Sequence, residues 1–199
     1  MVDRRVLCFG DSIVAGVGDP SGMGWVGRVA AASSAAGLPI TAYNLGVRGE
    51  TSLHIAKRWR AEAQPRLLPE ADCRIVLSFG ANDTTIDNGR ERVDGDRTSQ
   101  ALEGILDEAV ALELAVFVVG PAPVDDPEQN SRLIDLSASL VQVCGARAVP
   151  FVNVLEPLLA SEVWMGQVTT GDGAHPGADG YGALADQVLA GGWLEWLRS

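Results

Sequence analysis

The sequence has little positive charge, few cysteines and no long hydrophobic run. Its 15 Lys and Arg residues face 26 Asp and Glu residues, which gives a formal net charge of −11. A chain this acidic repels phosphate backbones and anionic lipid surfaces, so we expect no nucleic-acid partner. No continuous apolar run is long enough to span a bilayer, so we expect no insertion into a membrane.

The cysteines are three in number, an odd count, and they are scattered along the chain, which argues against a disulfide framework. Cys8 and Cys73 lie at apolar positions of predicted strands, so we interpret them as core residues. The amino terminus leads directly into an apolar segment of about five residues, which is too short for the hydrophobic region of a secretory signal. On these grounds we expect a cytoplasmic protein.

Short apolar runs alternate with segments of helical spacing throughout the 199 residues. We predict a single domain over residues 1–199, a length that allows a sizeable core. The predicted strands are residues 5–9, 40–44, 74–79, 115–119 and 149–154. The predicted helices are residues 25–36, 51–63, a segment from 102, a segment after 127, and 178–190. Each connection is long enough to cross over, so the strands should be parallel, with helices on both faces of a five-stranded sheet in a three-layer α/β/α sandwich.

The most informative stretch runs from Cys8 to Gly16. A buried strand stops at Gly10, and the polar pair Asp11-Ser12 follows at once. A serine at the carboxyl end of a buried strand lies where open α/β sheets bind their ligands, so Ser12 is a candidate nucleophile. The alternative is that Asp11 or Ser12 only caps a helix after the strand.

Three other polar stretches with glycine follow strands or lie near the carboxyl end, at residues 44–46, 80–83 and 172–175. The carboxyl ends of parallel strands open on one edge of a sheet. That edge would gather a hydroxyl, a free backbone N–H, a side-chain amide, an acid and an imidazole. Such groups form an acyl-transfer site, in which a base activates a serine and fixed donors stabilise the oxyanion.

His175 is one of only two histidines, and it precedes Pro176, which biases it away from helix. On a loop its imidazole can face the sheet edge, while Asp172, three residues earlier, reaches the other ring nitrogen. The second histidine, His54, falls within a predicted helix, and we interpret it as a structural or surface residue. The alternatives are a turn-forming Asp172, a tight turn at Gly46 and local backbone hydrogen bonding at Asn82.

Taken together in order, these stretches resemble the SGNH hydrolase superfamily, also called the GDSL lipase/esterase family, over the whole chain. The residues that match its motifs are Ser12, Gly46, Asn82, Asp172 and His175. One position departs from the pattern, because Ile13 stands where the family usually has Leu. The resemblance implies a flavodoxin-like fold, a metal-free catalytic triad of Ser12, His175 and Asp172, and no cofactor. It also implies an oxyanion hole made by the N–H groups of Ser12 and Gly46 and the side chain of Asn82.

Several other features of the sequence could indicate a different kind of site. Residues 22–27 match the dinucleotide fingerprint in their letters, but they do not directly follow a strand, so we interpret them as close packing beside a helix start. The acidic residues between Asp83 and Asp96 do not fit calcium-binding spacing, and we interpret them as part of a solvated loop. Arg48 could meet a substrate or anchor its loop, and Trp164 could wall an acyl pocket or pack in the core.

The polar stretch at residues 84–97 should leave the site edge as a functional loop, because structureless loops are seldom longer. Its composition suits a small or polar ester better than a lipid interface. We therefore predict a serine esterase that hydrolyses short-chain acyl esters or thioesters through an acyl-enzyme. The alternatives are a catalytically silent binding or scaffold module and a flavin- or nucleotide-binding domain.

Overall fold

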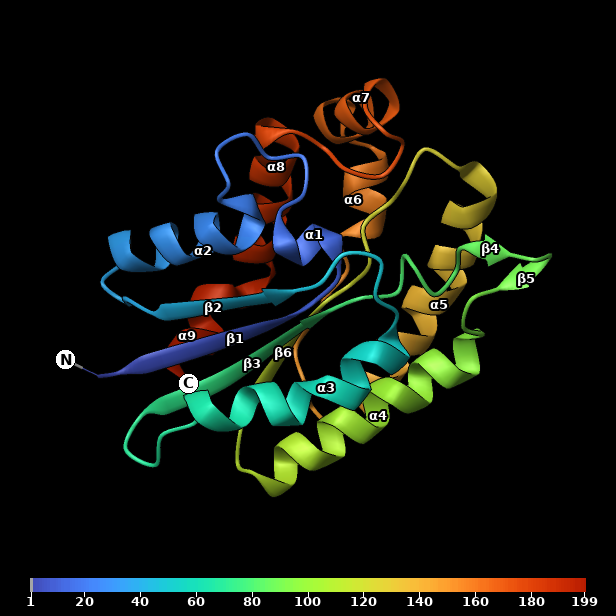
Figure 1. Ribbon diagram of the computed structural model, residues 1–199. Helices are drawn as coiled ribbons and strands as arrows, with labels where there is room; N and C mark the ends of the chain where they lie inside the picture. The colour runs from blue at the N-terminus through green and yellow to red at the C-terminus, as the bar shows by residue number, and fades with distance from the viewer. Residues whose placement is uncertain (1) are drawn as a thin grey trace.

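A parallel sheet lies at the centre of the molecule (Figure 1). The computed structural model describes residues 2–199. The sheet contains β1 (Arg4–Gly10), β2 (Thr41–Gly46), β3 (Asp72–Ser78), β6 (Ala115–Val119) and β7 (Phe151–Val152). These five strands lie in the order β2-β1-β3-β6-β7, and every neighbouring pair is parallel. This is the flavodoxin-like order, and it confirms the predicted α/β fold. Its topological switch point, where such folds bind ligands, lies between β1 and β3.

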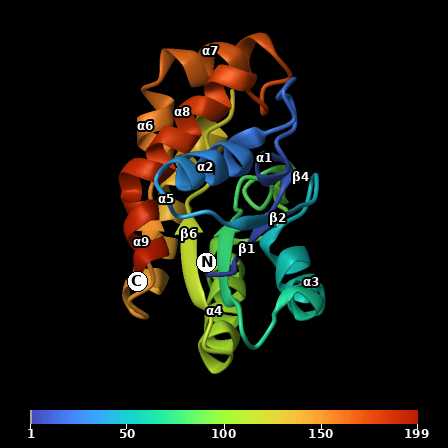
Figure 2. The ribbon, with the colours of Figure 1, turned by 90° about the vertical axis from the view of Figure 1, so that its left-hand side faces the viewer.

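Helices cover both faces of the sheet, as Figures 1 and 2 show. One face carries α3 (Ser52–Ala63), α4 (Gly95–Ala111) and α5 (Pro127–Gly145). The other carries α2 (Gly24–Ala35), α6 (Leu155–Leu159), α7 (Glu162–Thr170), α8 (Ala178–Val188) and α9 (Leu194–Arg198). A π-helical segment (Leu189–Trp193) joins the last two, and a short 3₁₀ helix (Gln64–Arg66) follows α3.

Strand β1 shows why the central strands consist of continuous apolar residues. Val6 and Cys8 join the core beneath α2 and α8, whereas Leu7 and Phe9 join the core beneath α3, α4 and α5. Successive side chains of a strand point to opposite faces, so a strand covered on both faces is apolar at every position. The predicted burial of Cys8 is confirmed at 1% exposure.

The prediction that residues 84–97 form a loop is wrong in part. It contains the two-stranded antiparallel hairpin of β4 (Ile86–Asp87) and β5 (Arg90–Glu91), and α4 already begins at Gly95. Asn88 and Gly89 form the turn with φ values of 52° and 79°. An Asn-Gly pair favours a two-residue hairpin turn because both positions need positive φ. The sequence therefore held a signal for the hairpin that the length argument did not use.

The fifth strand is shorter than predicted, with two residues in place of residues 149–154. Pro150 has no N–H to donate to the sheet ladder, although its carbonyl accepts from Val118 N at 2.9 Å. Ala148, just before it, has a φ of 52°, which is outside the strand region. Within residues 2–199, none of the helices combines the length and apolar character that a membrane span needs.

Candidate active site

Ser12 begins α1 (Ser12–Ala15), a four-residue helix that follows β1 directly. The turn between them is tight: a Cβ atom on Gly10 would lie 2.2 Å from the carbonyl oxygen of Ser78 and 2.3 Å from the side chain of Val14. Asp11 caps the helix by accepting a hydrogen bond from Ile13 N at 2.9 Å. The sequence offered capping and a functional serine as alternatives, and the structure shows that the cap holds Ser12 at the carboxyl edge of the sheet.

His175 lies between Ser12 and Asp172 on the loop before α8. Its Nε2 atom is 2.8 Å from Ser12 Oγ, and its Nδ1 atom is 2.7 Å from Asp172 Oδ2. The second carboxylate oxygen of Asp172 accepts the backbone N–H groups of Ala174 at 3.0 Å and His175 at 2.9 Å. Asp172 therefore shapes its turn with one oxygen and orients the imidazole with the other.

The hydrogen bond from the His175 side chain lowers the pKa of the Asp172 carboxyl to about 2, and the two backbone hydrogen bonds act in the same direction. Asp172 is therefore a carboxylate at neutral pH. A carboxylate on Nδ1 requires that this nitrogen carries the proton, which leaves Nε2 free to accept one from Ser12. The same charge can stabilise an imidazolium on this ring.

Asn82 follows β3 at the same edge of the sheet. Its Nδ2 atom donates to the carbonyl of Glu50 at 3.0 Å and to Asp11 Oδ2 at 3.2 Å. Burial raises the pKa of the Asp11 carboxyl to about 6, against the opposing effect of its hydrogen bonds from Ile13 N and Asn82 Nδ2. Both hydrogens of the Asn82 amide are thus occupied, and the longer of the two bonds is the one to Asp11.

The backbone of Gly46 lies against α1. A Cβ atom there would be 2.3 Å from Ala15 N and 2.7 Å from the Asp11 carbonyl oxygen, so only glycine fits. The Gly46 N–H donates to Asn44 Oδ1 at 3.1 Å and is not free in this structure. Gly46 is also not among the residues that line the cavity at Ser12.

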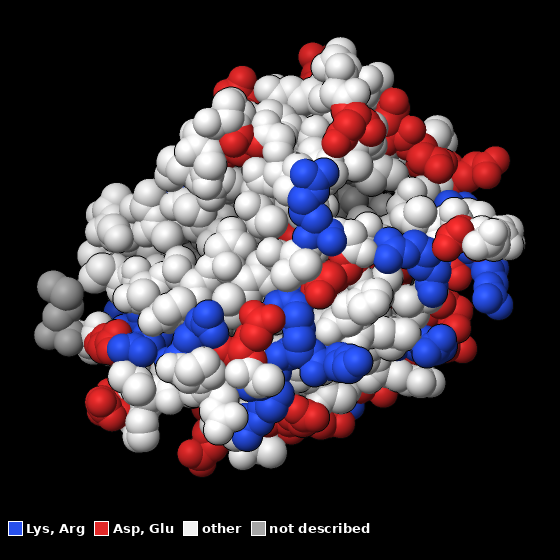
Figure 3. All heavy atoms as spheres, in the orientation of Figure 1, with Lys and Arg blue, Asp and Glu red and all other residues white. Residues whose placement is uncertain are grey.

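A cavity of about 310 Å³ opens at Ser12 and brings four of the candidate residues together. Ser12, Asn82, Asp172 and His175 line it. The rest of its wall is formed by Asp11, Ile13, Ala81, Thr85, Ala122, Val124, Asp125, Asp126, Gln129, Gly173 and Ala174. Figure 3 shows acidic side chains gathered over the region between α7 and the start of α5, and no Lys or Arg lines the cavity.

Sequence reasoning missed the part of this wall that comes from residues 122–129. The signal was present, because the segment follows the strand that ends before Gly120 and therefore emerges at the same sheet edge as Ser12 and Asn82. Gln129 and Asp125 belong to no motif of catalytic or ligand-binding residues, so the sequence around them does not indicate a site.

Two further expectations are corrected. Asp83 is not part of a solvated loop: it has no exposed surface and accepts hydrogen bonds from the backbone and hydroxyl of Ser52 and from Thr98 Oγ1 at 2.8 Å. Trp164 does not wall the cavity, because it is fully buried, donates from Nε1 to the Pro123 carbonyl at 3.1 Å and packs edge-on against Tyr181. The packing alternative therefore holds for Trp164.

Three other residues considered in the sequence lie outside the cavity at Ser12. His54 is exposed, and its Nδ1 atom completes the cap of α3 by accepting from Thr51 N at 3.2 Å, which is a structural role. Gly24, in the segment with the dinucleotide letters, begins α2 and packs closely on Gly16. Arg48 is exposed and does not line the cavity.

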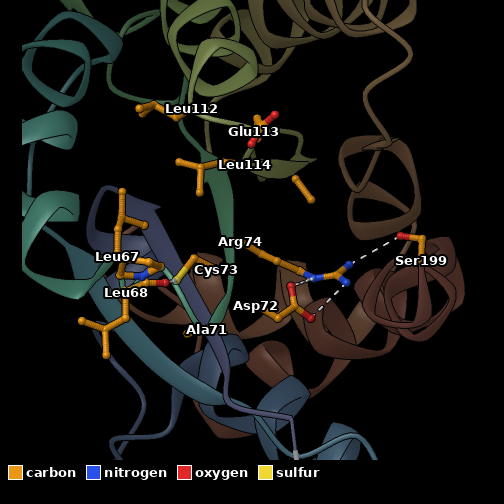
Figure 4. Close-up of a pocket in the computed structure, with 12 residues that line it drawn as sticks. Leu67, Leu68, Ala71, Asp72, Cys73, Arg74, Leu112, Glu113, Leu114 and Ser199 are labelled. Carbon is orange, nitrogen blue, oxygen red and sulfur yellow. Dashed lines mark hydrogen bonds and ion pairs between the residues drawn. The ribbon is translucent and has the colours of Figure 1, made fainter.

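A larger cavity, of about 570 Å³, lies at the opposite, amino-terminal edge of the sheet (Figure 4). Its apolar wall is formed by Leu67, Leu68, Leu112 and Leu114. Cys73 lies on this wall and is only partly buried, so its predicted core position is wrong. The guanidinium of Arg74 is paired with Asp72 at 2.8 Å. This cavity has no serine–histidine pair, so volume alone does not locate the chemistry.

The fold and the row of hydrogen-bonded serine, histidine and aspartate at its carboxyl edge are features of hydrolases. The family model of the GDSL-like lipase/acylhydrolase family matches residues 8–183, and the chain belongs to this family of ester-hydrolysing enzymes. None of the curated proteins compared with the chain matches it.

Solved structures share the fold at low sequence identity. The lipase/acylhydrolase from Enterococcus faecalis is 23% identical, with a TM-score of 0.78 and coverage of 94% of each chain. The acetylxylan esterase Axe2 from Geobacillus stearothermophilus is 20% identical, with a TM-score of 0.77 and coverage of 100% of this chain and 98% of that one. TesA is 22% identical, with a TM-score of 0.77 and coverage of 95% and 98%.

Proposed function

We propose that this protein is a serine esterase in which Ser12 is the nucleophile, His175 the base and Asp172 the residue that orients the base. The observation that carries the proposal is the unbroken row of two hydrogen bonds, at 2.8 Å and 2.7 Å, from Ser12 Oγ through His175 to Asp172. A hydroxyl becomes a nucleophile at neutral pH only when a base takes its proton during attack. The row supplies this base in the required tautomer.

In the first half-reaction, Ser12 Oγ attacks the acyl carbonyl carbon and its proton moves to His175 Nε2. The tetrahedral intermediate then expels the alcohol, or the thiol of a thioester, which leaves with the proton from Nε2. In the second half-reaction, water attacks the acyl-enzyme, and Nε2 takes a proton from this water. The carboxylic acid is released when Nε2 returns the proton to Ser12 Oγ, and no cofactor takes part.

The oxyanion of each intermediate needs donors that point at it beforehand. We assign this role to the N–H of Ser12, the amide of Asn82 and the N–H of Gly46. As the first residue of α1, Ser12 has an N–H without a partner inside the helix. Asn82 provides a donor by exchanging its longer hydrogen bond, to Asp11, for one to the oxyanion. Gly46 provides one by giving up its bond to the Asn44 side chain.

The substrate is a small ester with a short acyl chain, acetate to hexanoate. A volume of about 310 Å³ lies at the low end of ligand cavities, which supports this limit. Of residues 84–97, only Thr85 reaches the cavity wall, so the cavity volume and not this segment sets the limit. The structural relatives include an acetylxylan esterase, which agrees with a short acyl group.

A fluorophosphonate probe tests the proposal, because it reacts only with an activated serine. The wild-type protein should be labelled at Ser12 and should hydrolyse 4-nitrophenyl acetate. Ser12→Ala should lose both properties and keep its melting temperature, whereas the matched control Ser34→Ala, at an exposed position, should keep both. Folded wild-type protein that takes up no label, or a label that persists in Ser12→Ala, would instead indicate a silent scaffold.

A further inference from the structure

Gln129 lies in the first turn of α5 and lines the cavity at Ser12, although only 9% of it is exposed. Its backbone N–H is held by the capping side chain of Asp126 at 3.0 Å. The side chain reaches across to the segment that follows β3. A polar side chain buried to this extent needs hydrogen-bond partners at both ends of its amide, because unpaired buried polar atoms are costly.

The nitrogen end of the Gln129 amide is fully engaged. Nε2 donates to the Ala81 carbonyl at 2.7 Å and to the hydroxyls of Thr84 and Thr85, each at 3.3 Å. The Ala81 carbonyl can only accept, so the amide cannot be turned over without placing two oxygens together. This contact fixes the orientation of the amide, so Oε1 is the amide atom that can face the cavity.

The oxygen end of the amide has no partner. Among residues 2–199, no group donates a hydrogen bond to Gln129 Oε1. The atom is not sealed in the protein either, because it is not among the enclosed side-chain atoms that lack a hydrogen-bond partner. These atoms are Arg4 Nε, Trp25 Nε1, Ser137 Oγ and Trp196 Nε1. Gln129 therefore presents a fixed, unused hydrogen-bond acceptor to the cavity.

The neighbouring side-chain donors of the cavity wall already have partners in this structure. The Thr85 hydroxyl donates to the Ala81 carbonyl at 3.2 Å, and the Asn82 amide donates to Glu50 and Asp11. The Asp125 carboxylate accepts from Thr169 at 3.1 Å and adds no donor. Apart from the groups assigned to the triad and the oxyanion hole, the side chains of the wall thus offer acceptors to a ligand and no unpaired donor.

We propose that Gln129 is a specificity-determining residue whose Oε1 atom accepts a hydrogen bond from a hydroxyl group of the substrate. The enzyme should then prefer esters that carry a hydroxyl near the ester bond over analogues with a methyl group in its place. The inference rests on the proposed esterase function and adds the chemical class of its substrate. The hydroxyl belongs either to the acyl part or to the alcohol part of the ester, and the chemistry of recognition is the same in both cases.

Two matched pairs of substrates separate these sources. 4-Nitrophenyl glycolate and 4-nitrophenyl propionate differ only by a hydroxyl or methyl group on the acyl part. 2-Hydroxyethyl acetate and propyl acetate differ in the same way on the alcohol part. For each pair, the ratio of kcat/KM values is divided by the ratio of the rates with hydroxide ion, which removes intrinsic reactivity. We expect the wild-type enzyme to prefer the hydroxylated member of at least one pair about threefold to tenfold, the range of one neutral hydrogen bond.

Gln129→Met removes the acceptor and keeps the length of the side chain, so the corrected ratio should fall to about one. Thr84→Val is the matched control. It removes a hydroxyl from the same hydrogen-bond cluster, but it leaves Gln129 Oε1 in place and does not line the cavity. The control should keep the wild-type ratio.

The inference is overturned if the wild-type enzyme shows no preference in either pair, and this comparison decides the matter even if Gln129→Met does not fold. It is also overturned if Gln129→Met keeps the preference, or if Thr84→Val loses it equally, which would assign the effect to loop position. Failure of the esterase proposal looks different, because then wild-type protein would not hydrolyse 4-nitrophenyl propionate at all, or Ser12→Ala would hydrolyse it equally well.

Discussion

Replacing Gly46 by alanine should displace the helix that carries Ser12, because the glycine backbone packs directly against α1. The added Cβ atom would lie 2.3 Å from Ala15 N and 2.7 Å from the Asp11 carbonyl oxygen. Both are backbone atoms, so no side-chain rotation can relieve the overlap. Because α1 consists only of residues 12–15, the segment that must move is the one that carries Ser12.

The size of the displacement follows from the contact. An ordinary contact of a Cβ atom begins at about 3.4 Å, so Ala15 N must retreat by about 1 Å from its 2.3 Å position. If Ser12 moves with the helix by the same amount, its 2.8 Å hydrogen bond to His175 is lost. A misplacement of 1 Å costs about 10²-fold in rate, and overpacking costs about 1–3 kcal/mol of stability. We therefore expect kcat/KM of Gly46→Ala to fall about 10²-fold, with a melting temperature lowered by several degrees.

Steady-state kinetics with 4-nitrophenyl acetate and thermal melting together check this result. Gly104→Ala is the matched control, because a Cβ atom there meets no atom within 4 Å and the residue lies inside α4. It should keep full activity and gain up to about 1 kcal/mol of stability from the better helix propensity of alanine. Gly46→Ala protein that melts like the wild type and keeps more than half of its kcat/KM would refute the reasoning.

Three further predictions concern the polar residues of the site. Asn82→Ala should lower kcat about 10²–10³-fold with KM and melting temperature nearly unchanged, since an oxyanion donor acts in the transition state; an unchanged kcat per folded molecule, with earlier melting, would assign Asn82 to the scaffold. Asp172→Asn should lower kcat/KM by roughly 10²- to 10⁴-fold at pH 7, because the carboxylate, with its pKa lowered to about 2, no longer supports the imidazolium; a loss below tenfold in folded protein would contradict this role. The wild type should lose stability as the pH rises from 4 to 7, and Asp11→Asn should not. The free energy of unfolding of Asp11→Asn, relative to that of the wild type, should therefore increase over this range. The pKa of Asp11 is about 6 in the folded protein and 3.8 in the reference state, so between these values the folded state holds the extra proton and loses stability with rising pH, by up to about 3 kcal/mol. Urea unfolding of both proteins at pH 4 and pH 7 measures the change, and a difference that does not depend on pH would show that the Asp11 pKa is not raised.

The strands and the residues at their carboxyl ends could be predicted from the sequence because both depend on local patterns. A strand buried on both faces is an apolar run, and polar residues that follow such runs share one edge of a parallel sheet. Ser12 and Asn82 were placed in this way, and the cavity between them confirms that they lie together. His175 needed one more local feature, the proline after it, to be assigned to a loop.

The environments of Asp83 and Gln129 could not be predicted, because their partners are distant in the chain. Asp83 is buried since Ser52 and Thr98, from two different helices, both donate to it. The Gln129 side chain is held in its buried position because its amide donates a hydrogen bond to the carbonyl of Ala81, 48 residues away. Such contacts depend on how helices pack onto the sheet, and neither residue has a local pattern that reports them. The hairpin at Asn88-Gly89 is a different case, since its turn signal was local and was outweighed by the length of the polar stretch.

The hydrogen bond between Ser12 and His175 joins two residues that are 163 positions apart in the chain. The same two segments meet a second time where the Tyr181 hydroxyl, on α8, donates to the Val17 carbonyl at 2.7 Å. At 5–20 residues per second, a ribosome makes His175 roughly 8–30 s after Ser12. In the proposed mechanism, the nascent chain carries its serine without a base throughout that interval. Hydrolysis would then begin only after the loop that carries His175 has docked against Ser12, so activity would report on completed folding.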